Sequence, residues 1–146
     1  MKFVFMTEPD NNGISDVFHM VILTPETAPQ EMIDRWIEIS NASPITPLIV
    51  SGKENVAARS TWDPESESFS LEEGTPAEAA RPLTEKIVTF LINNTLKGLI
   101  ALPVTGAHSQ LLEAGFSGPV KINMLEDSSP VIPGYTWNGT EFTAPA

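Results

Sequence analysis

The sequence predicts an α+β fold that is mostly antiparallel sheet and is built as a tandem repeat of two small units. Short apolar runs with the alternation of strands are separated by turn signals, and helix-like stripes are few. A hairpin of the form Thr-Trp-(Asp or Asn), a turn and then Phe occurs at 61–69 and again at 136–142. The expected elements before both hairpins have the same order, which indicates a repeated hairpin–helix–strand–hairpin unit.

The first unit, residues 1–70, is expected to begin with a β-hairpin. Residues 2–6 and 15–23 alternate in the manner of strands, and residues 9–13 are a dense turn signal between them. Both faces of residues 2–6 are apolar. We therefore expect that strand to be central in its sheet or covered on both sides.

A helix is expected next. Residues 27–30 have the form of a capping box, which places Thr27 at the N-cap. The helix should end near Asn41, because the prolines that follow cannot continue it. Its apolar stripe consists of Met32, Ile33, Trp36 and Ile37. A short strand at 47–50 and the first Trp hairpin complete the unit.

Residues 71–83, rich in Glu, Ala and Pro, are the best candidate for a linker. The second unit, residues 84–146, is expected to repeat the order of the first: strands at 86–92 and 96–103, a helix at 107–115, a strand at 120–125 and the final Trp hairpin. When the halves are aligned, Lys2 falls on Lys86 and Trp62 on Trp137. The helix stripe falls on Leu111, Leu112, Gly115 and Phe116.

The final hairpin carries a strong turn signal. Asn138-Gly139 is typical of a type I′ turn, which needs positive φ at both central residues. A two-residue turn there would place Trp137 opposite Thr140, and Tyr135 opposite Phe142.

Aromatic residues at stripe or hairpin positions are expected to anchor the cores or an interface. They are Trp36, Trp62, Phe69, Phe116, Tyr135, Trp137 and Phe142. The alternative is a stacking platform for a sugar, made by the same residues without Phe116. The Trp–Phe spacing favours hairpins that pack their own core.

Composition excludes several classes. Lys and Arg total 8 against 19 Asp and Glu, giving a net charge of −11, which disfavours nucleic-acid binding. The absence of cysteine excludes disulfides and thiolate metal sites. The longest apolar runs are too short to span a membrane, and the one near the N-terminus is too short for a signal peptide.

No group of residues predicts catalysis, a cofactor or a metal site. His19 lies within an apolar strand and His108 in the first turn of a helix, with no second His close to either in sequence. Asp63, Glu65 and Glu67 alternate as a solvated face does and lack the loop of a Ca²⁺ site. Phosphate-loop, nucleophile-elbow and zinc-protease motifs are missing, and paired glycosidase carboxylates have no support. We expect a protein that is not an enzyme.

The C-terminal stretch carries a resemblance. Residues 134–145, Gly-Tyr-Thr-Trp-Asn-Gly-Thr-Glu-Phe-Thr-Ala-Pro, resemble the ending of short tailed-bacteriophage proteins, Gly-(aromatic or Ser)-Thr-(aromatic)-(Asp or Asn)-Gly-x-x-Phe-x-x-Pro. Residues 60–69 resemble it with two extra turn residues, and Arg59 stands where the glycine would precede them.

The resemblance implies a non-enzymatic structural or accessory component of a tailed-phage virion, in its tail, fibre or head-surface group, including capsid decoration. Such a protein acts by multi-copy assembly with other virion proteins, is assembled in the host cytoplasm, and needs no nucleic acid, membrane or cofactor. The alternative is a small binding module that recognises carbohydrate or a host surface through its aromatic residues. A small hydrolase ranks below both.

Overall fold

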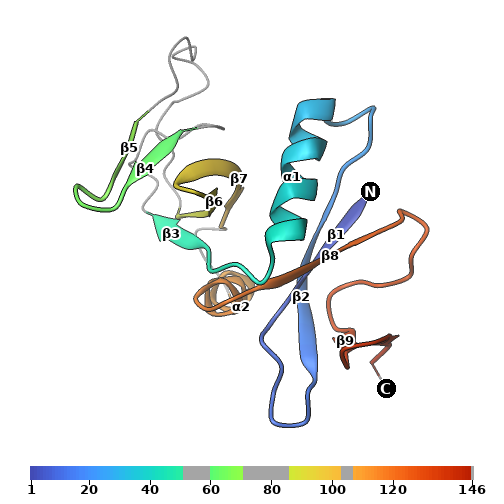
Figure 1. Cartoon of the computed structure of the whole chain (residues 1–146). Helices are drawn as coiled ribbons and strands as arrows, with labels where there is room; N and C mark the ends of the chain where they lie inside the picture. The colour runs from blue at the N-terminus through green and yellow to red at the C-terminus, as the bar shows by residue number, and fades with distance from the viewer. Residues whose placement is uncertain (51–59, 71–85, 103–106, 146) are drawn as a thin grey trace.

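The computed structural model describes residues 1–50, 60–70, 86–102 and 107–145. In these residues the α+β prediction is confirmed, with two helices and two five-stranded sheets of antiparallel strands (Figure 1). The helices are α1 (Gln30–Ala42) and α2 (Ala107–Phe116). The strands are β1 (Lys2–Met6), β2 (Ser15–Ile22), β3 (Leu48–Val50), β4 (Thr61–Asp63), β5 (Ser68–Ser70), β6 (Ile87–Ile92), β7 (Thr95–Ala101), β8 (Lys121–Leu125), β9 (Thr136–Trp137) and β10 (Phe142–Thr143). The predicted linker, 71–83, lies outside the described residues.

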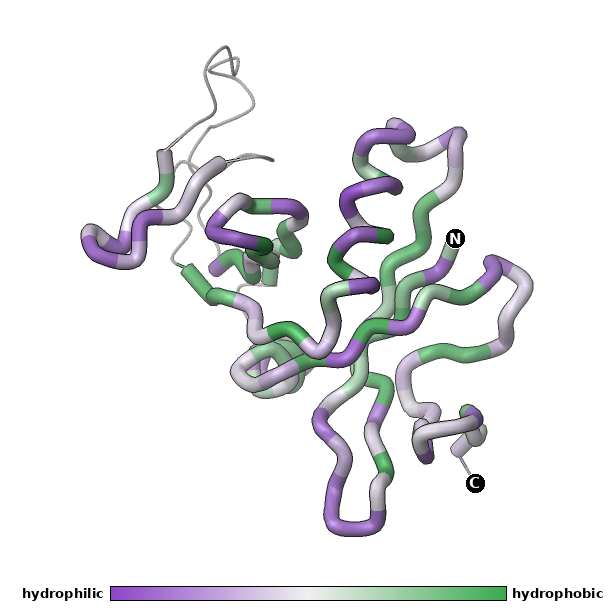
Figure 2. The backbone as a smooth tube through the Cα atoms, viewed as in Figure 1, coloured by the Kyte–Doolittle hydropathy of each residue, from purple (hydrophilic) through white to green (hydrophobic). Residues whose placement is uncertain are grey.

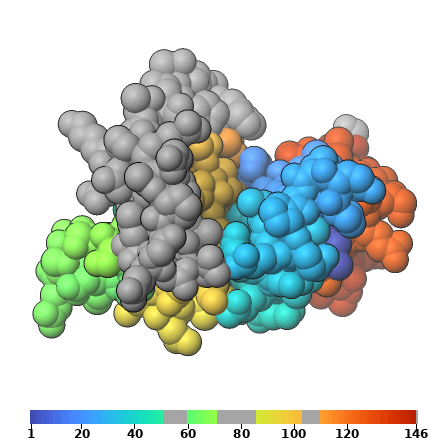
Figure 3. All heavy atoms as spheres, turned by 90° about the horizontal axis from the view of Figure 1, so that it is seen from above, coloured from blue at the N-terminus to red at the C-terminus, as the bar shows by residue number. Residues whose placement is uncertain are grey.

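Each sheet takes strands from both predicted units. Sheet 1 has the order β10-β9-β2-β1-β8, and sheet 2 has the order β3-β6-β7-β4-β5. The β1–β2 hairpin is therefore flanked by strands from residues 84–146, and the β6–β7 hairpin by strands from residues 1–70. The view from above shows α1 between the β4–β5 hairpin and the C-terminal segment (Figure 3).

The inner faces of both sheets meet in one core. Trp36 of α1 lies at its centre, with ring centroids 5.8 Å from Phe5 of sheet 1 and 5.3 Å from Phe90 of sheet 2. Apolar residues of β1, β6 and α1 form this core. The β1–β2 and β4–β5 turns are hydrophilic (Figure 2). Burial of the large aromatic rings supplies much of the hydrophobic stabilisation.

Strand β1 is central, as its two apolar faces predict. All five of its residues are buried, and β2 and β8 pair with its two edges. On its outer face Val4 and Met6 join a second cluster with Val131, to which Trp137 and Phe142 contribute from the C-terminal hairpin.

The helix prediction needs two corrections. The N-cap is Pro29 rather than Thr27, because the Thr27 hydroxyl hydrogen bonds within the preceding turn, to Thr24. The buried stripe of α1 is Ile33, Trp36 and Ile39, whereas Met32 is exposed and Ile37 only half-buried. The stripe therefore follows the i, i+3, i+6 positions that face the sheets.

The predicted register of the final hairpin is wrong. Trp137 pairs with Phe142, and Thr136 pairs with Thr143, so four residues form the loop. The reason is the Asn138 side chain, whose Oδ1 accepts the N–H groups of Thr140 and Glu141 at 2.9 Å each and builds an Asx-type turn. Positive φ at two successive non-glycine residues occurs instead at Asn93 and Asn94, between β6 and β7.

Candidate functional site

Two of the seven predicted anchors lie deep in the shared core. Trp36 is 5% exposed and Phe116 is fully buried. Phe116 packs edge-on against Phe5 and Phe90, with centroids 5.7 and 5.9 Å away. Neither ring offers a face to a ligand.

The other five anchors are half-buried and belong to the two Trp hairpins. Trp62 lies 4.8 Å from Phe69, and Trp137 lies 4.5 Å from Phe142, measured between ring centroids. These rings pack as cross-strand pairs, and Tyr135 packs on the outer cluster of sheet 1. The structure therefore brings the anchors together in pairs rather than on one flat platform.

The surroundings of the Trp137 ring include one cation but no acceptor for its indole N–H among the described residues. Lys121 Nζ lies 5.8 Å from its centroid, within reach of a cation–π contact. The buried indole Nε1 finds no hydrogen-bond acceptor among the described residues.

The two histidines belong to different elements, His19 to β2 and His108 to α2. The His19 ring lies 5.5 Å from Phe5 and 5.9 Å from Phe116, which places it at the edge of the aromatic core. His108 belongs to α2, and its side-chain surroundings lie outside the described part of the chain.

The acidic side chains of the β4–β5 hairpin are exposed, as expected of a solvated face. The backbone N–H of Glu65 and then the Ser66 hydroxyl donate to the Asp63 carboxylate and lower its pKa below the ordinary value. This carboxylate closes its own turn. Within the described residues, no three His, Asp or Glu side chains converge as metal ligands.

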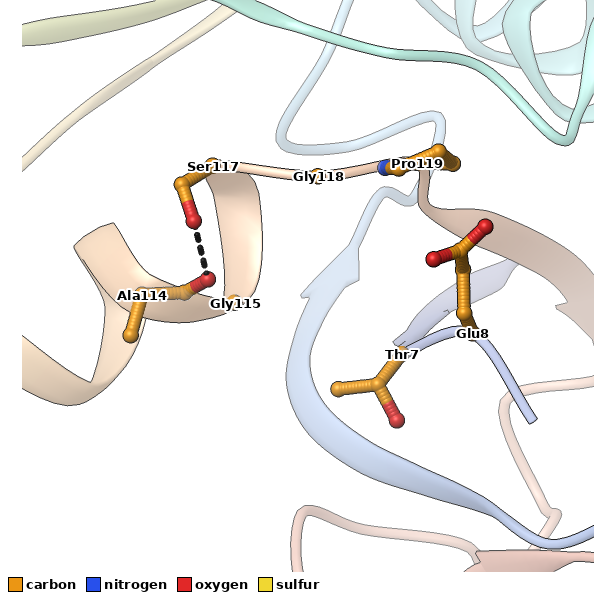
Figure 4. A pocket seen from close by; sticks show the side chains of 7 residues that line it. All are labelled: Thr7, Glu8, Ala114, Gly115, Ser117, Gly118 and Pro119. Carbon is orange, nitrogen blue, oxygen red and sulfur yellow. Dashed lines mark hydrogen bonds between the residues drawn. The ribbon is translucent and has the colours of Figure 1, made fainter. Parts of the chain in front are cut away.

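One hollow lies beside the end of α2, which we call the α2 pocket. It has a volume of about 240 Å³ and is lined by Thr7, Glu8, Ala114, Gly115, Ser117, Gly118 and Pro119 (Figure 4). Its only charged group is the Glu8 carboxylate. The Ser117 hydroxyl donates to the Ala114 carbonyl at 2.7 Å, so it closes the last turn of α2. The pocket is smaller than the roughly 300–1,000 Å³ typical of ligand sites.

Two features escaped prediction from sequence. Lys2 is a buried lysine whose Nζ donates to the carbonyls of Ser129 and Val131 at 2.6 and 2.9 Å, fastening the C-terminal segment to β1. Gly98 of β7 leaves room for α1: a Cβ there would lie 2.9 Å from both Ile39 Cδ1 and Trp36 Cζ2. An isolated glycine within a strand pattern was the available signal for that close approach.

Comparison of the chain with protein-family models, with curated protein sequences and with solved structures gives no match. Among the described residues, neither helix is long and apolar enough to cross a membrane.

Proposed function

We propose that this chain is a tandem repeat of two α+β units and serves as a non-enzymatic structural or accessory component of a tailed-phage virion. It acts by multi-copy assembly with other virion proteins and uses no cofactor. The phage-like endings at 60–69 and 134–145 point to this class, and the repeated architecture is consistent with an assembly module.

The observation that carries the repeat is the matching register of the two sheets. Phe5 pairs with His19 and Met6 with Val17, so the β1–β2 register shifts between Phe5 and Met6. In the β6–β7 pair the register shifts at the equivalent place, between Phe90 and Leu91. A bulge adds one residue to a strand and bends it at that position, so a bulge at the same position of two hairpins supports a common origin of the two.

The flanking strands match as well. Lys2 pairs with Leu125 as Ile87 pairs with Val50, and the N–H of Val17 reaches the Tyr135 carbonyl as that of Leu96 reaches the Ser60 carbonyl. Replacing each strand of sheet 1 by its counterpart gives the order of sheet 2. Five strands from each half therefore hold matching places in the two sheets, which supports the proposed repeat.

Open sheet edges supply a means of assembly. Strands β8 and β10 end sheet 1, and β3 and β5 end sheet 2, and among the described residues no further strand pairs with their outer edges. Such edges add strands from a neighbouring protein. The acidic surface favours a neighbour with a basic face.

The sugar-binding alternative has less support. Trp36 is buried, and Trp62 and Trp137 are each packed against a phenylalanine of their own hairpin. Specific binding to a glycan array that is lost in both Trp62→Ala and Trp137→Ala, with folding retained, would favour it instead.

The proposal is tested by quantitative mass spectrometry of virions purified from cells that produce the encoding phage. We expect the chain in a fixed number of copies per virion that survives a high-salt wash. A chain that remains in the lysate and is absent from purified virions would contradict the proposal.

A further inference from the structure

We propose that the contact between the two halves of the chain is a reciprocal dimer interface enclosed within one polypeptide. Residues 1–70 and 84–146 each bind the other as two subunits of a homodimer do, and the partner that fits each half is the other half, in the same chain or in a second copy. This inference rests on the tandem repeat proposed above and adds how its units recognise one another.

The two halves exchange strands. Strand β3 and the β4–β5 hairpin leave the β1–β2 hairpin of their own half and flank β6 and β7. Strands β8, β9 and β10 make the reverse exchange and complete the sheet of β1 and β2. A half without its partner is left with an isolated two-stranded hairpin, which is at best marginally stable in water.

Ile45 and Val120 make a reciprocal contact between the two halves. The Ile45 N–H donates to the Val120 carbonyl at 2.9 Å, and the Val120 N–H donates to the Ile45 carbonyl at 2.8 Å. Ile45 precedes β3 and Val120 precedes β8, so the two occupy the same place in their halves. An isologous interface has this kind of self-pairing at its twofold axis.

Both halves contribute equally to the shared core. Of the fourteen buried residues that form this core in the described part of the chain, seven come from each half. They are Phe3, Phe5, Leu23, Ala28, Ile33, Trp36 and Ile39 from the first, and Val88, Phe90, Leu102, Leu112, Phe116, Val120 and Ile122 from the second. Separation would expose both sets to water, which hydrophobic burial opposes.

Cleavage of the folded full-length chain tests the proposal. A protease recognition sequence placed after Gly74 allows the purified protein to be cut once, and native mass spectrometry then reports whether the fragments stay together. We expect one complex containing both fragments. When cut protein is unfolded and refolded with an isotope-labelled cut sample, mixed complexes should form. Fragments that separate on cutting, or that re-form only their original labelled or unlabelled pairs, would overturn the inference.

Matched variants locate the interface. Val120→Asp buries a carboxylate beside Ile45 and should weaken the association of the cut fragments by at least about 100-fold. Leu111→Asp, at a position on α2 that is 65% exposed, should leave it unchanged. Equal association of the two cut variants would place the contact elsewhere. Failure of virion binding would contradict only the proposed function, since the cleavage test needs no virion.

Discussion

Gly98→Ala is the most informative single substitution, because Gly98 lies in the second half and its close neighbours lie in the first. A Cβ at Gly98 would sit 2.9 Å from Trp36 Cζ2 and 2.9 Å from Ile39 Cδ1, closer than carbon atoms pack. The Trp36 ring has little room to move, because Phe3, Phe5 and Phe90 surround it at centroid distances of 6.2, 5.8 and 5.3 Å.

Overpacking of this kind costs about 1–3 kcal/mol. For a chain of this length, that loss lowers Tm by roughly 3–9 °C. The matched control is Gly118→Ala, where a Cβ meets no atom within 4 Å. The control should change stability by no more than about 0.5 kcal/mol.

Urea denaturation followed by tryptophan fluorescence measures both variants. A double-mutant cycle with Trp36→Phe, which replaces the crowded indole by a smaller ring, should give a favourable coupling of at least about 0.5 kcal/mol. Identical unfolding curves for Gly98→Ala and Gly118→Ala, or additive effects in the cycle, would refute the packing of α1 against β7.

Two pairs of substitutions and one pH titration test other parts of the fold. Trp137→Ala should lower the free energy of unfolding by about 2 kcal/mol, roughly half the cost at a fully buried site, because the ring is half-buried against Phe142. Trp62→Ala should have a similar effect. Unchanged urea midpoints in both variants would indicate a binding role for these rings instead. Lys2→Met should lower the free energy of unfolding by about 1–3 kcal/mol, because two carbonyls lose a charged donor. The control Lys86→Met breaks only an exposed ion pair with Glu113 and should have little effect on stability. Equal losses of stability in the two variants would contradict the buried role of Lys2. Because the pKa of Asp63 is lowered, its carboxylate stabilises the β4–β5 hairpin at pH values above the ordinary pKa of 3.8, and this stabilisation is lost as pH falls through the lower pKa of the folded state. An NMR titration of Asp63 with a midpoint at or above 3.8 would show that the Glu65 and Ser66 donors do not stabilise the carboxylate.

The sequence predicted the local elements and missed the long-range pairing. The apolar alternation of residues 2–6 correctly indicated a strand covered on both faces, and the Trp–Phe spacing correctly placed two hairpins. Alternation shows which face of a strand is buried, but not which strand lies beside it. The exchange of β3 and β8 between halves was therefore invisible from sequence.

The alignment of the two halves by residue similarity differs by one position from the alignment that the strand pairing indicates. The sequence alignment placed Lys2 on Lys86, whereas under the proposed repeat Lys2 corresponds to Ile87, since Lys2 pairs with Leu125 and Ile87 pairs with Val50. A buried lysine stands where the other half has a buried isoleucine. The carbonyls of Ser129 and Val131 accept hydrogen bonds from its ammonium group. These two residues lie 127 and 129 positions after Lys2 in the sequence. Such a partner at long range leaves no local pattern.

The aromatic anchors were only partly predictable. Helical periodicity marked Trp36 as a core residue, and it is buried. The stripe could not show that Met32 is exposed while Ile39 is fully buried, because that depends on the packing of α1 against β6 and β7, which come from the other half of the chain.

The exchange of strands between the halves is tested most directly by an engineered disulfide at Ile45 and Val120. The chain has no cysteine of its own, so Ile45→Cys/Val120→Cys creates a single pair. Hydrogen-bonded antiparallel partners have Cα atoms about 5.5 Å apart, a separation that suits a disulfide. Under mild oxidation we expect a monomer whose mass falls by two hydrogens and which stays in one piece after cleavage at the site placed after Gly74, even when unfolded without reductant. Free thiols in the oxidised protein, or disulfides only between separate chains, would contradict the exchange.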